Sequence, residues 1–207
     1  MSPDQIDSLD WDKQNGLLPA IVQDANNRRV LMVGYMNREA LAITRSSRRV
    51  TFWSRSKERL WTKGETSGHT LNFVRVEADC DRDALLVLAT PNGLTCHLER
   101  ASCFEDAPFD FLAVLDALVE ARDRDRPSGS YTTALFEGGT RKIAQKVGEE
   151  GVETALAAVT QDDRALLGEA ADLVYHLVVL LRSRGLSLSD AVRVLSDRHA
   201  LRQEDHR

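Results

Sequence analysis

Short hydrophobic blocks separated by polar turns dominate the first half of the chain and predict β-strands. Residues 19–23 and 30–36 are mostly apolar and flank the polar stretch 24–29, a pattern that predicts a hairpin with an Asn-containing turn. Residues 38–47 instead carry apolar side chains at helical spacing. Further strands are predicted over residues 49–55, 70–81 and 84–90, with a turn at 91–93.

Helical spacing takes over in the second half of the chain. Predicted helices cover residues 109–122, 140–160, 163–185 and 188–203. Between the first two, residues 123–130 combine charge with Pro, Gly and Ser and are typical of a linker. Gly185 is suited to end the third helix in a left-handed conformation. We therefore predict two domains: a strand-rich α+β domain over residues 1–105 and an all-α bundle over residues 106–207.

The composition narrows the class of protein. With 207 residues, 43% of them hydrophobic, the chain is long enough to bury a core in each domain. A net charge of −5 argues against a nucleic-acid partner, and no run approaches the ~20 apolar residues of a membrane helix. The acidic, polar start does not resemble a targeting peptide. Three cysteines, an odd number, favour a reducing compartment, so we expect a cytoplasmic protein.

Three aspartates occupy alternate positions at the end of the predicted strand 70–81 and just beyond it. If the strand keeps its alternation, Asp79, Asp81 and Asp83 share one face, and Cys80 lies with Val74 on the opposite, apolar face. Carboxylates some ~7 Å apart repel one another and resist ionisation unless a cation lies among them. Hard oxygen ligands suit Mg²⁺. A solvated acidic strand end is the alternative.

The three cysteines form a second candidate metal site. Cys96 follows Cys80 by sixteen positions and precedes Cys103 by seven, a spacing unlike the close pairs of zinc fingers. Three thiolates would leave a fourth zinc position open for water, as in catalytic sites, and His97 could move a proton there. Three buried, inert thiols beside an ordinary surface histidine are the alternative.

Carboxylates also recur at helical spacing on two of the predicted helices. On the first helix Glu150 lies on the apolar stripe, with Glu149 and Glu153 flanking it. On the second helix Glu169 and Asp172 lie three residues apart. Salt bridges to nearby basic residues would explain either helix alone. The recurrence on both helices favours a cation shared between them, as in other helical bundles.

The first hundred residues resemble phosphoribosyl-AMP cyclohydrolases. The resemblance rests on the segments LMVGYMNREAL, VTFWSRSKERLWTKGETSGHTLNFV, DCDRDALLVLATPNGLTCH and ASCF. It implies hydrolytic opening of a purine ring at its N1–C6 bond, with His97 or His69 moving the proton. It also implies a homodimer whose zinc ligands come from both subunits. The implied ligands are Asp79, Asp81 and Asp83 for Mg²⁺ and Cys80, Cys96 and Cys103 for Zn²⁺.

The same resemblance assigns a substrate-binding stretch within this domain. The matching residues are Arg55, Trp61, Lys63, Ser67 and Gly68. Arg55 and Lys63 suit phosphate, and Ser67 and Gly68 can offer hydrogen-bond donors. Trp61 suits stacking on a base, with packing in the core as the alternative.

The remaining residues resemble phosphoribosyl-ATP pyrophosphatases, a branch of the MazG-like all-α nucleoside triphosphate pyrophosphohydrolases. The segments that carry the resemblance are SYTTALFEGGTRKIAQKVGEEGVETALAA and EAADLVYHLVVLL, and the SYT and KVGEEGVE motifs separate this branch from the general family. Glu149 is a candidate further ligand or water activator, and His176 is expected to be a hydrogen-bonded histidine and not a ligand. The implied Mg²⁺ ligands are Glu150, Glu153, Glu169 and Asp172, and the residues suited to the triphosphate are Arg141, Lys142 and Lys146.

Together the two halves resemble the bifunctional enzymes of histidine biosynthesis, which act on phosphoribosyl nucleotides. The second domain would remove pyrophosphate from phosphoribosyl-ATP, and the first would open the adenine ring of the product. Two rivals remain at this point. One is a general nucleotide pyrophosphohydrolase fused to a structural or degenerate zinc domain. The other is a binding module in which zinc only holds a dimer together.

Overall fold

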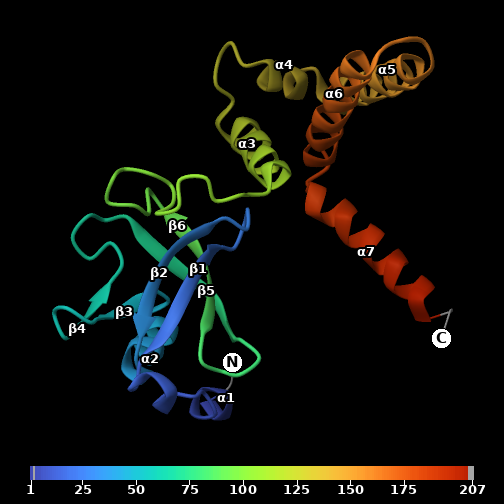
Figure 1. Cartoon of the computed structure of the whole chain (residues 1–207). Helices are drawn as coiled ribbons and strands as arrows, with labels where there is room; N and C mark the ends of the chain where they lie inside the picture. Colours follow the sequence, from blue (N-terminus) through green and yellow to red (C-terminus); the bar gives the residue numbers. More distant parts are fainter. Residues whose placement is uncertain (2, 205–207) are drawn as a thin grey trace. The chain divides into compact units, whose positions relative to one another are not determined.

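The computed structural model describes residue 1 and residues 3–204 of the chain, and it divides into two compact units (Figure 1). The first unit is Met1–Asp110 and contains all the strands that the structure describes. The second unit, Phe111–Arg207, is helical in its described part. The predicted α+β and all-α classes are both confirmed. The division falls five residues beyond the position predicted from the sequence.

A four-stranded sheet forms the centre of the first unit. Its strand order is β2-β1-β6-β5, with β1 and β6 parallel and the outer pairs antiparallel. The strands are β1 (Leu18–Asp24), β2 (Val30–Met36), β5 (Thr70–Ala78) and β6 (Leu85–Asn92). A separate two-stranded sheet pairs β3 (Thr51–Ser54) with β4 (Arg59–Thr62), and the helices are α1 (Pro3–Asp7), the 3-10 turn η1 (Asp12–Gln14) and α2 (Arg38–Ser47).

The predicted hairpin and helix of this unit are confirmed. β1 and β2 pair antiparallel, and α2 spans the predicted residues 38–47. Asn37 begins α2, because its side chain accepts a hydrogen bond from the backbone N–H of Ala40 at 2.7 Å. The short strand β4 and the helix α1 were not predicted from the sequence.

The core of the first unit lies between the sheet and its covering elements. Alternate residues of β1 are buried, as a half-buried strand requires. Phe52 of β3 is fully buried and fills the space above Gly34 of β2, where a Cβ atom would lie 2.3 Å from the ring. A larger residue than glycine would therefore displace a core aromatic side chain at this crossing.

The predicted alternation through residues 71–83 is wrong in two respects. A β-bulge between Phe73 and Arg75 shifts the register, so that Val74 is exposed while Val76 is buried. The strand then ends at Ala78, and the aspartates lie on a turn. Cys80 is exposed on that turn, not placed on an apolar face.

Five helices build the second unit. They are α3 (Phe111–Asp125), α4 (Tyr131–Glu137), α5 (Gly139–Thr160), α6 (Asp163–Arg182) and α7 (Leu188–Glu204). α5 and α6 pack against each other most extensively, and Figure 1 shows them side by side. The predicted helices are confirmed, and Gly185 follows α6 with a φ of +71°. α4 was not predicted, and α3 extends into the stretch expected to be a linker.

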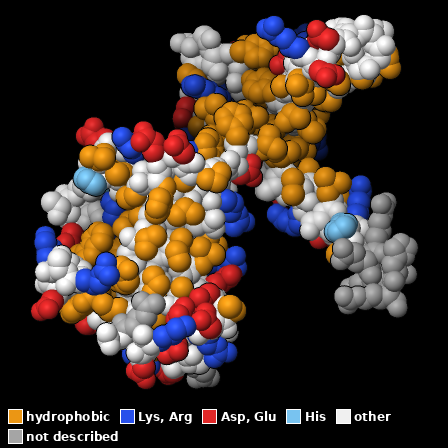
Figure 2. All heavy atoms as spheres, viewed as in Figure 1, with side chains coloured by type: hydrophobic (Ala, Val, Ile, Leu, Met, Phe, Trp, Pro, Cys, Tyr) orange, Lys and Arg blue, Asp and Glu red, His pale blue; other side chains and the backbone are white. Residues whose placement is uncertain are grey.

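The helical unit has a small core and a large exposed apolar surface. Its core residues are Val119, Leu135, Phe136, Ile143, Val178 and Val179. Figure 2 shows hydrophobic side chains gathered on the visible face of this unit, over α3, α4 and α6. Among the described helices, none combines the length and the apolar content that crossing a membrane would require.

Candidate functional sites

The turn after β5 gathers the three predicted aspartates. Carboxylate oxygens of Asp79, Asp81 and Asp83 lie within 4.8 Å of one another. Asp79 holds the turn closed, because its side chain accepts hydrogen bonds from the backbone N–H groups of Asp83 and Ala84 at 3.0 and 3.1 Å. The aspartates therefore come together through a turn, not through the alternation of a strand.

A lysine lies among these carboxylates. The Lys13 ammonium is 2.8 Å from Asp81 and 2.5 Å from Asp83, and it lowers the pKa of Asp81. Lys13 is brought here by its chain neighbours, since the backbone N–H of Asp10 donates to the carbonyl of Arg82 at 2.9 Å. This internal cation relieves the repulsion between the aspartates.

Cys96 and Cys103 form a close pair at one side of the first unit. Burial and the neighbouring Cys96 raise the pKa of the Cys103 thiol, and the Lys63 ammonium opposes that rise. The loop that carries the pair is fixed to β2, because the backbone N–H of Cys103 donates to the carbonyl of Leu31 at 2.8 Å. In the part of the chain that the structure describes, Cys80 does not join this pair in a three-ligand cluster.

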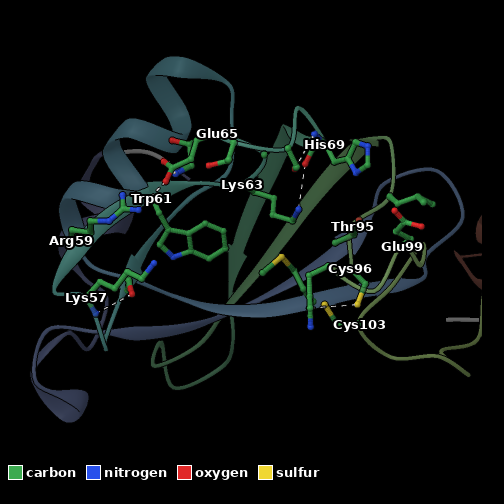
Figure 3. Close-up of a pocket in the computed structure, with 18 residues that line it drawn as sticks. Lys57, Arg59, Trp61, Lys63, Glu65, His69, Thr95, Cys96, Glu99 and Cys103 are labelled. Carbon is green, nitrogen blue, oxygen red and sulfur yellow. Dashed lines mark hydrogen bonds and ion pairs between the residues drawn. The ribbon is translucent and has the colours of Figure 1, made fainter.

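A cavity of about 600 Å³ opens beside the cysteine pair (Figure 3). Trp61 and Lys63 line it from the end of β4, and the two cysteines line it from their loop. The lining residues are Met32, Ser54, Lys57, Arg59, Trp61, Thr62, Lys63, Gly64, Glu65, Thr66, Ser67, His69, Leu94, Thr95, Cys96, His97, Glu99 and Cys103. Thiols, imidazoles and basic groups thus face one cavity that is open to solvent.

Most residues of the predicted substrate stretch line this cavity, but two do not. Trp61, Lys63 and Ser67 belong to the lining, whereas Arg55 and Gly68 do not. The Arg55 guanidinium instead stacks on the ring of Tyr35, 3.8 Å from its centroid. Trp61 serves two purposes, because it also packs on the core ring of Phe52 with 5.0 Å between centroids.

Both candidate proton carriers face the cavity. The Nδ1 atom of His97 lies 3.9 Å from the Cys96 sulfur. His69 is held from two sides, since Lys63 donates to its backbone carbonyl at 3.3 Å and its ring lies over Gly93. A Cβ atom at Gly93 would come within 2.7 Å of that ring. Glycine at position 93 therefore leaves the space that the His69 ring occupies.

Eleven of the eighteen lining residues were not predicted as site residues from the sequence, and three of these bear on the chemistry of the cavity. Lys57 and Arg59 add positive charge to the cavity, although Arg59 also pairs with Glu65 at 3.1 Å. Strand alternation would have found Arg59, because it shares a face of β4 with Trp61. Thr95 is 3% exposed, and its hydroxyl has no hydrogen-bond partner. No sequence signal marks it apart from its place beside Cys96.

In the helical unit, α5 and α6 bring the predicted carboxylates together. Oxygens of Glu150, Glu169 and Asp172 lie within 4.8 Å of one another, and Glu150 is 5% exposed, as its place on the apolar stripe predicts. Glu153, the fourth predicted ligand, is exposed and lies outside this group of three. Partial desolvation, together with the nearby Glu150 and Glu169, raises the pKa of the Glu153 carboxyl, so its charge still acts on the cluster.

The three basic residues of α5 that were expected to bind triphosphate differ in their contacts. The Lys146 ammonium bridges Glu149 at 2.9 Å and Glu150 at 3.0 Å, and it lowers the pKa of Glu149. Arg141 and Lys142, the other residues expected to bind triphosphate, are exposed on α5. The salt-bridge alternative and the carboxylate cluster are thus both present on this helix.

The sequence matches the models of two known protein families. The model of the phosphoribosyl-AMP cyclohydrolase family matches residues 32–105, and that of the phosphoribosyl-ATP pyrophosphohydrolase family matches residues 112–199. The chain belongs to both families. The cyclohydrolase domain thus carries the cysteine pair and the cavity, and the pyrophosphohydrolase domain carries the carboxylate cluster of α5 and α6.

Curated relatives combine the two domains in the same way. A protein of Xanthomonas campestris is 66% identical over 196 residues, which cover 95% of each chain. One of Xylella fastidiosa (strain Temecula1) is 68% identical over 194 residues, covering 94% of each, and one of Salmonella typhimurium is 54% identical over 201 residues, covering 96% of this chain and 99% of its own. Each is named histidine biosynthesis bifunctional protein HisIE.

Proposed function

We propose that both domains hold divalent cations at the side chains described above and use them for hydrolysis. The chain is a bifunctional enzyme of histidine biosynthesis. Its pyrophosphohydrolase domain converts phosphoribosyl-ATP to phosphoribosyl-AMP, and its cyclohydrolase domain opens the adenine ring of that product, giving phosphoribosylformimino-aminoimidazole carboxamide ribotide. The observation that carries the metal proposal is that each domain gathers three carboxylates within 4.8 Å.

The α5–α6 cluster fits Mg²⁺ by its chemistry. Its ligands are carboxylate oxygens, one of them on the buried Glu150, and a hard cation would relieve their repulsion. Bound Mg²⁺ supplies positive charge to the phosphate oxygens as the bond breaks. Glu149 lies beside the cluster, and its lowered pKa keeps it ionised, so it can serve as a further ligand or hold the attacking water in place. Arg141 and Lys142 are exposed on the same helix and would meet the triphosphate.

The cysteine pair fits Zn²⁺ only in part within one chain. Cys96 and Cys103 supply two soft ligands, whereas Cys80 lies on the aspartate turn. A homodimer in which a second copy supplies Cys80 would complete a three-thiolate site, as the family resemblance implies. Zn²⁺ bound there would lower the pKa of a water ligand toward neutrality and so supply hydroxide. His97 or His69 would then move the proton during ring opening.

The substrate of the cyclohydrolase domain suits the groups around its cavity. Lys57, Arg59 and Lys63 offer positive charge to the two phosphates of phosphoribosyl-AMP, and Trp61 offers a ring to its base. Mg²⁺ at the aspartate turn would help hold the nucleotide. The three free thiols support the expectation of a reducing, cytoplasmic compartment.

The test is to strip the full chain of metal, supply phosphoribosyl-ATP, and return Mg²⁺ and Zn²⁺ separately and together. Mg²⁺ alone should restore pyrophosphate release, and ring opening of phosphoribosyl-AMP should also require Zn²⁺. Metal content and folding are measured on the same sample. Unfolding on removal of zinc would favour a structural zinc, and activity that ignores both metals would refute the proposal.

A further inference from the structure

The SYT motif has no part in the mechanism above, yet the structure fixes all three of its residues. Ser130 precedes α4 and caps it, its hydroxyl accepting from the backbone N–H of Thr133. The Thr132 hydroxyl lies 2.8 Å from that of Tyr175, and the Tyr131 hydroxyl lies 3.0 Å from Nε2 of His176. The motif thus attaches the start of α4 to two neighbouring residues of α6.

His176 connects this attachment to the carboxylate cluster. The imidazole is 4% exposed, and its Nδ1 lies 2.9 Å from the backbone carbonyl of Asp172. A carbonyl oxygen only accepts hydrogen bonds, so Nδ1 carries a proton, and in the neutral ring Nε2 accepts from the Tyr131 hydroxyl. The same Nδ1 lies 3.6 Å from Glu150. One imidazole ring therefore separates Tyr131 from the carboxylates, and the expectation of a hydrogen-bonded histidine is confirmed.

Tyr131 is held in place without being buried. Its residue surface is 56% exposed, although its hydroxyl is bonded and its ring is oriented against two others. The ring lies at 24° to that of Tyr175 and at 82° to that of His176. Fixing an exposed aromatic side chain loses rotamer freedom and gains little burial in return. A ligand that covers the ring would provide the missing contact.

The chemistry of the substrate indicates what that ligand is. In phosphoribosyl-ATP a single ribose separates the adenine from the α-phosphate, where the reaction takes place. When the triphosphate lies at the α5–α6 carboxylates, the base must lie about one ribose away. Tyr131 is exposed and aromatic, and one imidazole, that of His176, connects it to that cluster. An aromatic ring can stack on the face of any base.

We propose that Tyr131 is a specificity-determining residue of the pyrophosphohydrolase site and that its ring stacks on the adenine of phosphoribosyl-ATP. His176 acts as a positioning residue, because it fixes the Tyr131 hydroxyl relative to Glu150. The proposal rests on the proposed function in placing the triphosphate at the carboxylates.

The test compares ligands with and without a base on the full chain. Tyr131→Leu removes the ring, Tyr131→Phe keeps it without the hydroxyl, and Phe111→Leu removes a 63% exposed ring elsewhere in the same unit as a matched control. The probes are a non-hydrolysable α,β-methylene analogue of phosphoribosyl-ATP and inorganic tripolyphosphate, each measured as an inhibitor of pyrophosphate release. Ring opening by the cyclohydrolase domain of the same sample reports that the protein is intact.

Tyr131→Leu should bind the base-containing analogue roughly 5- to 100-fold more weakly, the range of one base–aromatic contact. It should raise KM for phosphoribosyl-ATP to a similar extent and leave tripolyphosphate inhibition unchanged. Tyr131→Phe should lose less, and Phe111→Leu nothing. Three results would each overturn the proposal. They are equally weakened binding of both probes, unchanged binding of the analogue, and a changed oligomeric state as the sole effect. Failure of the proposed function would instead appear as absent pyrophosphate release in the unaltered chain.

Discussion

Replacing Gly93 with alanine should separate the two activities of this enzyme through one side chain. Gly93 has a φ of +93°, and a Cβ atom there would lie 2.7 Å from Cδ2 of His69. Ordinary contact begins near 3.4 Å, so the imidazole has to move by about 0.7 Å. His69 lines the cyclohydrolase cavity and is one of two candidate proton carriers. The change therefore acts on the ring-opening site and on no residue of the carboxylate bundle.

The loss of ring-opening activity expected for Gly93→Ala can be compared with that of a control variant, Gly16→Ala, which has the same kind of backbone strain. An L-residue in the left-handed region costs roughly 1–2 kcal/mol, and Gly16 has a φ of +81° with nothing within 4 Å of its Cβ position. Gly16→Ala and Gly93→Ala should therefore lose similar stability in thermal denaturation. Only Gly93→Ala displaces a group in the cavity, and a misplacement approaching 1 Å can lower a rate by about 100-fold.

The assay follows the ultraviolet absorbance of the purine with phosphoribosyl-AMP as substrate, and pyrophosphate release with phosphoribosyl-ATP. We expect Gly93→Ala to lower kcat for ring opening about 10- to 100-fold and to leave pyrophosphate release unchanged. A ring-opening kcat within about threefold of that of Gly16→Ala would refute the reasoning, since it would show that the position of His69 does not matter to the reaction.

Four further changes test the remaining assignments. Cys96→Ala should lower bound zinc and abolish ring opening while pyrophosphate release continues; retained ring opening would place the zinc elsewhere. Glu150→Gln should lower pyrophosphate release about 100-fold or more with ring opening intact, and an unaffected rate would move the bundle site. Lys13→Met should tighten Mn²⁺ binding at the aspartate turn severalfold, as measured by calorimetry, because Mn²⁺ would no longer compete with the Lys13 ammonium for the carboxylates. An unchanged affinity would mean that Lys13 and the metal do not compete. In metal-free protein Glu153 has a raised folded-state pKa, so its stabilising contribution is present below the unfolded pKa and is lost as the pH rises through the folded one. Glu153→Gln should accordingly raise the Tm at neutral pH, and the gain should shrink on acidification; a gain independent of pH would contradict this.

The carboxylates of the bundle were predictable because their geometry is local. Residues three and four apart share a helix face whatever the rest of the fold does, so Glu150 could be placed on the apolar stripe from the sequence alone. The approach of Glu150 to Glu169 and Asp172 of α6 needed only that the two helices pack together. The buried contact of Glu150 with His176 depends on that packing and could not be read from either helix.

The prediction for Cys80 failed because the strand stops at Ala78, before it reaches the cysteine. The bulge at Val74 changes the face of Val74 alone, since Val76 beyond it is buried and Glu77 exposed, as the alternation predicts. The strand ends there because Asp79 accepts two backbone hydrogen bonds and so favours a turn. Asp-rich stretches are depleted in strands, which is a signal present in the sequence that the alternation argument left aside.

Long-range pairings lay beyond sequence reasoning. The parallel pairing of β1 with β6 joins residues more than sixty positions apart, and the hydrophobic pattern of each strand is equally compatible with other partners. The helix α4 was missed for a different reason. It has seven residues and follows a stretch rich in charge, Pro and Gly, so the capping role of Ser130 was the one local sign of a helix start.

Both carboxylate clusters hold a lysine, and this bears on what the metals do. Lys146 bridges two glutamates from the preceding turn of the same helix, whereas Lys13 reaches the aspartate turn from 68 positions away. In each unit an ammonium therefore already offsets part of the like charge before any metal binds, although in the bundle Glu153 still experiences the charges of Glu150 and Glu169. Folding then has little need of the hard cations, and a cation that binds must first displace or share the lysine. A chelator of Mg²⁺ should consequently abolish turnover at concentrations that leave the melting curve of the chain unchanged. If the metal were purely structural, the melting temperature would fall before turnover was lost.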